Sequence, residues 1–126
     1  MLKVDPKNDA VANNYSYFLS LRKEKLSFAS EMAAKLVERN PVNATFLDTY
    51  GWVLFVDKQY PKAKEYLEKA YTINDGKSAV IIEHYGDVLY KLGEKEKAID
   101  LWKKAALKDT KNKDLEKKIA EGRIIE

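Results

Sequence analysis

One cluster in this sequence has side chains that could bind a metal ion, namely Glu83-His84-x2-Asp87. His84 and Asp87 are three residues apart, so they would share one face of a helix. A zinc site needs three or four ligands, usually including more than one histidine or cysteine. The chain has one histidine and no cysteine. The cluster therefore favours a single groove or surface histidine, and we expect no metal and no other cofactor.

Motifs for the common catalytic chemistries are missing from the sequence. The five glycines are scattered instead of forming a phosphate-binding loop. No serine lies in a nucleophile-elbow motif with an accompanying histidine and aspartate. The absence of cysteine excludes disulfides, thiolate metal sites and a cysteine nucleophile. We therefore expect a protein that is not an enzyme.

The composition is that of a single domain with a hydrophobic core. The 126 residues are 45% hydrophobic and 34% charged, and 23 basic against 20 acidic residues give a net charge of +3. The lysines of the last third alternate with acidic residues and read as a solvated surface. This balance argues against nucleic-acid binding, and no apolar run approaches the roughly 20 residues that span a membrane. No targeting signal is present, and the sequence assigns no compartment.

A repeat of 35 residues organises the chain. The pairs Tyr15-Ser16, Tyr50-Gly51 and Tyr85-Gly86 are each 35 residues from the next. Apolar residues recur at the same distances around each pair: Ala12, Leu47 and Ile82 before it, and Leu19, Leu54 and Leu89 after it. Spacings of three and four residues indicate helices and not strands. Each unit is therefore predicted to contain two amphipathic helices.

The spacing predicts helices near residues 8–22, 26–39, 43–57, 60–74, 78–92, 95–108 and 113–121. The single domain, 1–126, would hold repeats at 8–42, 43–77 and 78–112 and a closing helix and tail at 113–126. Residues 1–7 contain Asp5-Pro6, which is typical of a helix end. They read as the remnant of a preceding repeat, so the sequence reads as a segment of a longer protein. Leu2 and Val4 would then belong to a lost helix, and we expect weak self-association through this N-terminal end.

Small residues mark where the two helices of each unit approach closely. Ser16, Gly51 and Gly86 are predicted to face small residues on the partner helix, namely Ala29, Ala63 and Ala98. A glycine inside a helix costs about 1 kcal/mol relative to alanine, so its presence at two matching positions needs a packing reason.

With these residues the sequence resembles the tetratricopeptide repeat family. The second unit reads Leu47-x2-Tyr50-Gly51-x2-Leu54 and Ala63-x3-Leu67, the third follows the same pattern, and the first is degenerate. The chain most resembles the C-terminal repeat block of larger bacterial members. The resemblance implies an all-α, right-handed α-solenoid of three helix-turn-helix units with a C-terminal capping helix. It also implies a non-enzymatic scaffold that binds a peptide or partner protein.

In that family the first helix of each pair lines the concave face. The resemblance therefore assigns partner binding to Asn13, Tyr17, Asp48, Thr49, Trp52, Phe55, Glu83, His84, Asp87 and Tyr90. Trp52 and Phe55 lie off the core stripe, and large aromatics in such positions serve as interface anchors. The carboxylates would favour an apolar or basic segment. Carboxylate-clamp adaptors of the family hold a peptide terminus with basic residues on this face. Here Lys91 is the only basic residue among those assigned to it, so that function is not expected.

Three alternatives remain open at the level of the sequence. The repeats could be a purely structural C-terminal cap of a longer array. The period also matches pentatricopeptide RNA binders, although the chain has no basic groove. Trp52 and Phe55 could simply pack against the first helix of the neighbouring unit.

Overall fold

A computed structural model describes residues 8–124, and in that part the chain forms seven α-helices and no strand. The helices are α1 (Asp9–Arg22), α2 (Leu26–Arg39), α3 (Ala44–Val56), α4 (Tyr60–Asn74), α5 (Ala79–Lys91), α6 (Lys95–Lys108) and α7 (Lys113–Glu121). Each helix begins and ends within one residue of its predicted limits. Leu2 and Val4, to which the sequence analysis assigned a lost helix, lie outside the described residues.

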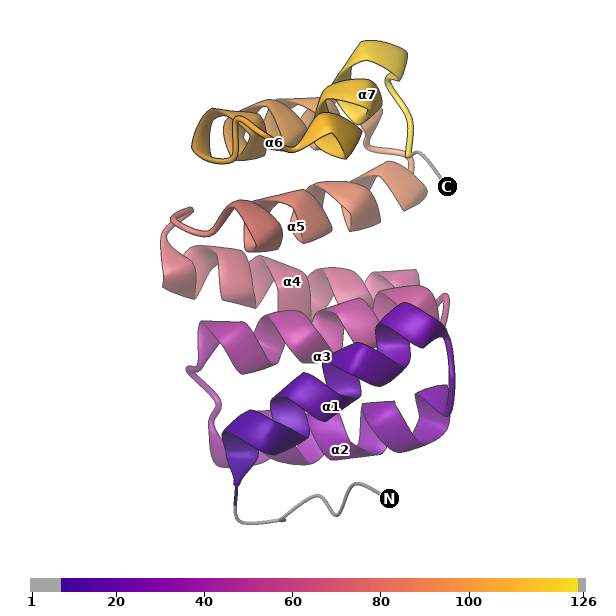
Figure 1. The fold of residues 1–126 in the computed structure, drawn as a ribbon, viewed down its shortest axis with the longest axis vertical. Coiled ribbons are helices and arrows are strands. Elements are labelled where there is room, and N and C mark those ends of the chain that lie inside the picture. Colours follow the sequence, from indigo (N-terminus) through magenta and orange to yellow (C-terminus); the bar gives the residue numbers. More distant parts are fainter. Residues whose placement is uncertain (1–7, 125–126) are drawn as a thin grey trace.

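The helices pack as three antiparallel pairs, α1–α2, α3–α4 and α5–α6, and α7 packs on α6. The pairs follow one another along the long axis of the molecule, from α1 and α2 at one end to α7 at the other (Figure 1). The first helices also contact one another, α1 with α3 and α3 with α5. The predicted all-α, right-handed solenoid with a capping helix is thereby confirmed. No helix in the described part is both long and apolar enough to cross a membrane.

The first helices and α7 start in the same way. Asn8, Asn43, Ser78 and Asn112 each precede one of these helices, and each side chain accepts a hydrogen bond from the backbone N–H three residues later. Such a cap satisfies one of the free N–H groups of a helix start. The second helices α2, α4 and α6 have no side-chain cap and follow a tight turn. The start of α7 is therefore that of a first helix.

The close approach of paired helices is present, but its closest contacts differ from the prediction. A Cβ added to Gly51 would lie 2.6 Å from Cγ of Leu67, one turn beyond the expected Ala63. A Cβ on Gly86 would lie 2.8 Å from Cδ1 of Trp102 and 3.3 Å from the backbone oxygen of Ala98. The partner helix thus fills the space above each glycine with a large side chain. Ser16, Ala29, Ala63 and Ala98 are fully buried.

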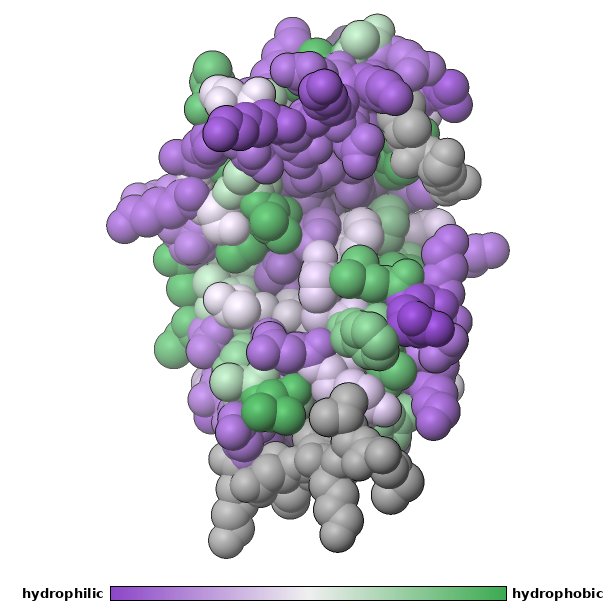
Figure 2. All heavy atoms as spheres, viewed as in Figure 1, coloured by the Kyte–Doolittle hydropathy of each residue, from purple (hydrophilic) through white to green (hydrophobic). Residues whose placement is uncertain are grey.

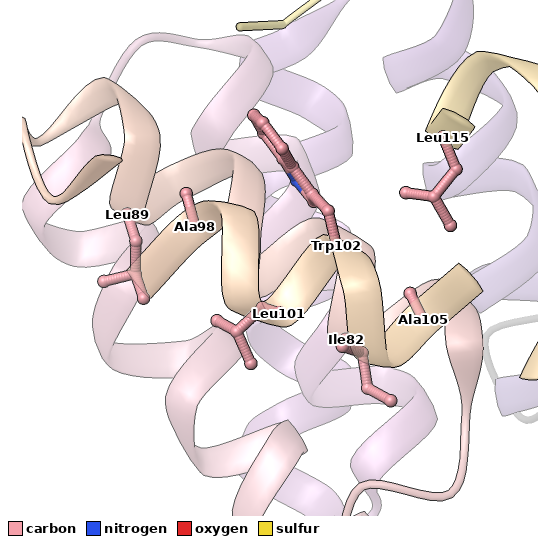
Figure 3. Packing of buried hydrophobic residues seen from close by; sticks show 7 residues of the cluster. All are labelled: Ile82, Leu89, Ala98, Leu101, Trp102, Ala105 and Leu115. Atoms are coloured by element: carbon pink, nitrogen blue, oxygen red, sulfur yellow. The ribbon is translucent and has the colours of Figure 1, made fainter. Parts of the chain in front are cut away.

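The core continues from the last pair into α7. Figure 3 shows Trp102 projecting from α6 and Leu115 projecting from α7 within one apolar cluster. The cluster consists of Ile82, Leu89, Ala98, Leu101, Trp102, Ala105 and Leu115. In the view of Figure 2 the surface over α6 and α7 is mainly hydrophilic, while apolar patches lie below it. Helix α7 therefore closes this end of the core with a polar outer face.

Candidate functional site

Aromatic side chains gather on the first helices α1, α3 and α5 and at the start of α4. The Trp52 indole stacks on the His84 imidazole with ring centroids 4.0 Å apart, and on the Phe55 ring at 4.7 Å. Phe55 also meets Tyr60 edge-on at 5.3 Å, and Tyr17 lies 6.2 Å from His84. Except for His84, these side chains are only partly buried. We call Tyr17, Trp52, Phe55, Tyr60 and His84 the aromatic strip.

The aromatic strip is held across two repeats by a buried hydrogen bond. Nδ1 of His84 lies 2.9 Å from Oδ1 of Asp48, and the two residues are 6% and 7% exposed. Burial opposes protonation of His84, but the carboxylates of Asp48, Asp87 and Glu83 outweigh it and raise the pKa of His84. The His84 ring that stacks on Trp52 is therefore protonated more readily than a free histidine.

The carboxylates of α5 are bound by the capping helix. Nζ of Lys118 lies 2.6 Å from Oε2 of Glu83 and 3.0 Å from Oδ1 of Asp87. The same Asp87 oxygen accepts a hydrogen bond of 3.0 Å from Nε1 of Trp102. Burial disfavours the charge on Lys118, but the carboxylates of Asp87 and Glu83 more than compensate and raise the pKa of Lys118. Lys118 is thus buried and paired, which corrects its assignment to a solvated surface.

The Asp48–His84 contact and the Glu83–Lys118 contact are equivalent to each other, one repeat apart. Asp48 and Glu83 each stand five positions after the N-cap of their helix, and His84 and Lys118 each stand six positions after theirs. We call Asp48–His84 and Glu83–Lys118 the inter-repeat pairs. In both, a carboxylate on one first helix binds a nitrogen atom of a side chain on the next, Nδ1 of His84 in one pair and Nζ of Lys118 in the other. Helix α7 therefore occupies the position of a fourth first helix.

Two polar atoms near the aromatic strip have no hydrogen-bond partner among residues 8–124. They are Oδ1 of Asn13, at the position equivalent to Asp48, and Nε1 of Trp52. Leaving a buried donor or acceptor unpaired costs about 1–3 kcal/mol. Such groups are rare in folded proteins, and each needs a specific explanation.

The structure brings some of the sequence-predicted residues together and separates others. Tyr17, Trp52, Phe55 and His84 meet in the aromatic strip. Thr49 is buried, and Tyr90 lies instead against Trp102, at 5.7 Å. Sequence reasoning missed Tyr60 and Lys118. The distance of Lys118 from the N-cap Asn112 could have identified it, because His84 stands equally far from Ser78.

Metal-ligating groups do not converge at this site. Within residues 8–124 no three histidine, cysteine or carboxylate side chains are grouped so that they could hold a metal ion. The ring of His84 is stacked on Trp52 and bonded to Asp48. The arrangement combines partly exposed aromatic rings with buried ionisable side chains.

Comparison with known proteins identifies the fold. No protein-family model matches the sequence, and no curated protein matches it either. Among solved structures, the first TPR of Spaghetti (RPAP3) bound to the HSP90 peptide SRMEEVD is 15% identical, with a TM-score of 0.80 over 97% of this chain and 95% of that chain. The first TPR domain of human RPAP3 is 14% identical, with a TM-score of 0.81 over 94% and 91% of the two chains. The Sgt2 TPR domain from Aspergillus fumigatus is 14% identical, with a TM-score of 0.79 over 90% and 76%. The chain therefore has the tetratricopeptide-repeat fold.

Proposed function

We propose that this chain is a non-enzymatic protein-interaction module that holds a segment of a partner protein on the aromatic strip, at the concave face of the first helices. The stack of Phe55, Trp52 and His84 carries the proposal. Its Phe55 and Trp52 rings are only partly buried, while His84 in the same stack is buried. Large aromatic side chains of this kind contribute much of the affinity in protein interfaces. The Nε1 donor of Trp52 is buried and has no hydrogen-bond partner within residues 8–124.

The chemistry of the strip supports an apolar or basic segment. The residues Asp48, Glu83 and Asp87 supply three carboxylates near the strip, and their partners are His84 and Lys118. A protonated imidazole and its partner carboxylate cancel, so a small negative excess remains. An acidic segment like the SRMEEVD peptide bound by the Spaghetti domain would meet this excess. That peptide is therefore a suitable negative control.

The experiment is affinity capture from lysate with identification of the captured protein, followed by calorimetry with the identified segment. Trp52→Ala should weaken binding by about 2 kcal/mol, the magnitude of an interface hot spot, and leave the helicity nearly intact. Phe28→Ala is the matched control, because Phe28 is an aromatic of α2 outside the strip and is 47% exposed. Equal capture by the parent, Trp52→Ala and Phe55→Ala would refute binding at the strip.

One observation favours a second candidate, a structural end for a longer array. Helix α7 closes the last pair with an inter-repeat pair and a polar outer face, as terminal repeats of solenoids do. On that view Trp52 serves only to pack α3 against α5. A longer natural protein that captures its partner equally well with and without Trp52→Ala would favour this candidate.

A further inference from the structure

We propose that the surface of α5 and α6 beneath α7 is a docking site for an amphipathic helix of another protein, and that α7 occupies this site in the free chain. The helix that fits carries a leucine, a lysine three residues later and an apolar residue directly after the lysine. This site shares the Glu83 and Asp87 carboxylates with the neighbourhood of the aromatic strip, but its apolar contacts lie between α5, α6 and α7. Its existence does not depend on binding at the strip.

The contacts of α7 define what the site recognises. Leu115 is fully buried in the apolar cluster of α5 and α6, and Ile119 packs against the same cluster. Lys118 reaches Glu83 and Asp87, and its Nζ lies 5.8 Å from the centre of the Trp102 ring. An apolar surface beside the buried Asp87 carboxylate and the partly buried Glu83 carboxylate is therefore covered by the Leu-x2-Lys-Ile face of one short helix.

The attachment of α7 is weak for several physical reasons. The helix has nine residues, and helices this short are marginal without tertiary contacts. Two of its residues, Leu115 and Lys118, are buried. Removing the Lys118 charge from water opposes docking and offsets much of the attraction to the carboxylates. Segments with few buried contacts open first in folded proteins.

The site also favours a longer helix than α7. Nine residues extend about 14 Å and the fourteen of α6 about 21 Å, at 1.5 Å per residue. A partner helix without the short connection after α6 can lie along more of that length. Burial raises the pKa of the Asp87 carboxyl, and the charges on Lys118 and His84 only partly offset this rise.

Calorimetry on the full chain, with a synthetic peptide of residues 112–124 as the probe, tests the proposal. In the parent, α7 competes with the probe at an effective concentration on the order of millimolar. We expect the full-chain variant Leu115→Ala/Lys118→Ala to bind the probe at least tenfold more tightly than the parent, because its own α7 is released. Adding Glu83→Gln to this variant should weaken the probe again.

Two controls make the result specific. A probe with Leu115→Ser and Lys118→Ser should not bind, and the variant Lys117→Ala, altered on the exposed side of α7, should bind the probe as the parent does. Amide exchange in the Leu115→Ala/Lys118→Ala variant shows whether its α7 is released. If α7 is released and this variant binds the probe no more tightly than the parent, the proposal is overturned. If the variant loses the α1–α6 fold, the test is carried out on the isotope-labelled parent, by measuring amide exchange with and without the probe. Saturating unlabelled probe should speed amide exchange in α7 alone, and unchanged exchange there would overturn the proposal.

Discussion

His84, the single histidine of the chain, connects two repeats through its aromatic ring face and through a ring nitrogen. Its ring face packs on Trp52, and its Nδ1 meets the Asp48 carboxylate. A protonated ring strengthens both contacts, since a cation is attracted to the carboxylate and to the face of an indole. The state of one proton thus affects how firmly α3 and α5 are joined.

Stability should accordingly fall as the pH rises through the pKa of His84 in the folded protein. That pKa is raised above its ordinary value of 6.5. The contribution is therefore fully present below about pH 6.5 and is lost above the folded-state value. Urea unfolding across this range, with NMR titration of the His84 ring, measures the effect. His84→Gln should remove the pH dependence, and a slope that persists in this variant would assign it to other groups.

The two helix glycines should be intolerant of side chains. Gly51→Leu and Gly86→Leu would force atoms into Leu67 and Trp102, which stand under 3 Å from the added Cβ. We expect each to lower the free energy of unfolding by about 3 kcal/mol, the upper end of overpacking effects. Denaturant unfolding measures the loss, with Ser27→Leu at an exposed position of α2 as the control. If both glycine variants are as stable as the parent, the paired helices can move apart enough to accommodate a leucine, and the prediction is wrong.

Helical spacing predicts one part of this arrangement. Asp48, Trp52 and Phe55 are four and three residues apart, which predicts a common helix face. In the structure Asp48 is hydrogen-bonded to His84, and Trp52 stacks on the same ring. The partners of Glu83 and Asp87 could not be predicted in this way. They depend on the position of Lys118, which follows only once α7 is recognised as a continuation of the stack.

At the scale of the helices, the sequence determined the bounds well because the chain marks them chemically. Asn43 and Ser78 are N-caps, and Gly93 adopts a left-handed conformation with φ of 90°. The equivalent turns carry Lys23 and Lys58, with φ of 55° and 64°. Lysine gives no sequence signal for this conformation, so the 35-residue alignment with Gly93 is what reveals it.

Lys58→Gly should therefore stabilise the protein. A left-handed conformation costs a non-glycine residue about 1–2 kcal/mol, and the greater flexibility of glycine in the unfolded chain returns part of that gain. We expect a net increase of about 0.5–1 kcal/mol in the free energy of unfolding, measured by denaturant titration. Gly93→Lys is the reverse substitution and should destabilise. A destabilised Lys58→Gly would mean that the lysine side chain itself supports the turn.

For the whole molecule, the two ends of the stack differ. At the far end α7 covers the last pair, whereas α1 exposes Phe18 by 48%. The equivalent residues, Val53 and Val88, are fully buried and pack near the second helix of the preceding pair. In α3 and α5 the equivalent side of the helix is therefore buried against the preceding pair, whereas in α1 this side carries the exposed Phe18.

We expect weak, concentration-dependent self-association through α1. Exposed apolar surface of this kind favours contact between copies. Sedimentation velocity over a range of concentrations should show a rising average mass for the parent. Phe18→Ser should reduce it, and Leu107→Ser, at an 82% exposed leucine of α6, is the matched control. A parent that sediments as a monomer at millimolar concentration would refute the expectation.

The placement of the two tryptophans has a practical consequence for optical measurements. Trp52 touches the Asp48–His84 pair, and the indole N–H of Trp102 is bonded to Asp87 beside Lys118. Indole emission responds to the charge and polarity of what contacts the ring. The protein therefore carries one intrinsic fluorophore at each inter-repeat pair. Replacing either tryptophan with phenylalanine would let the other report separately, one on events at the aromatic strip and one on release of the final helix.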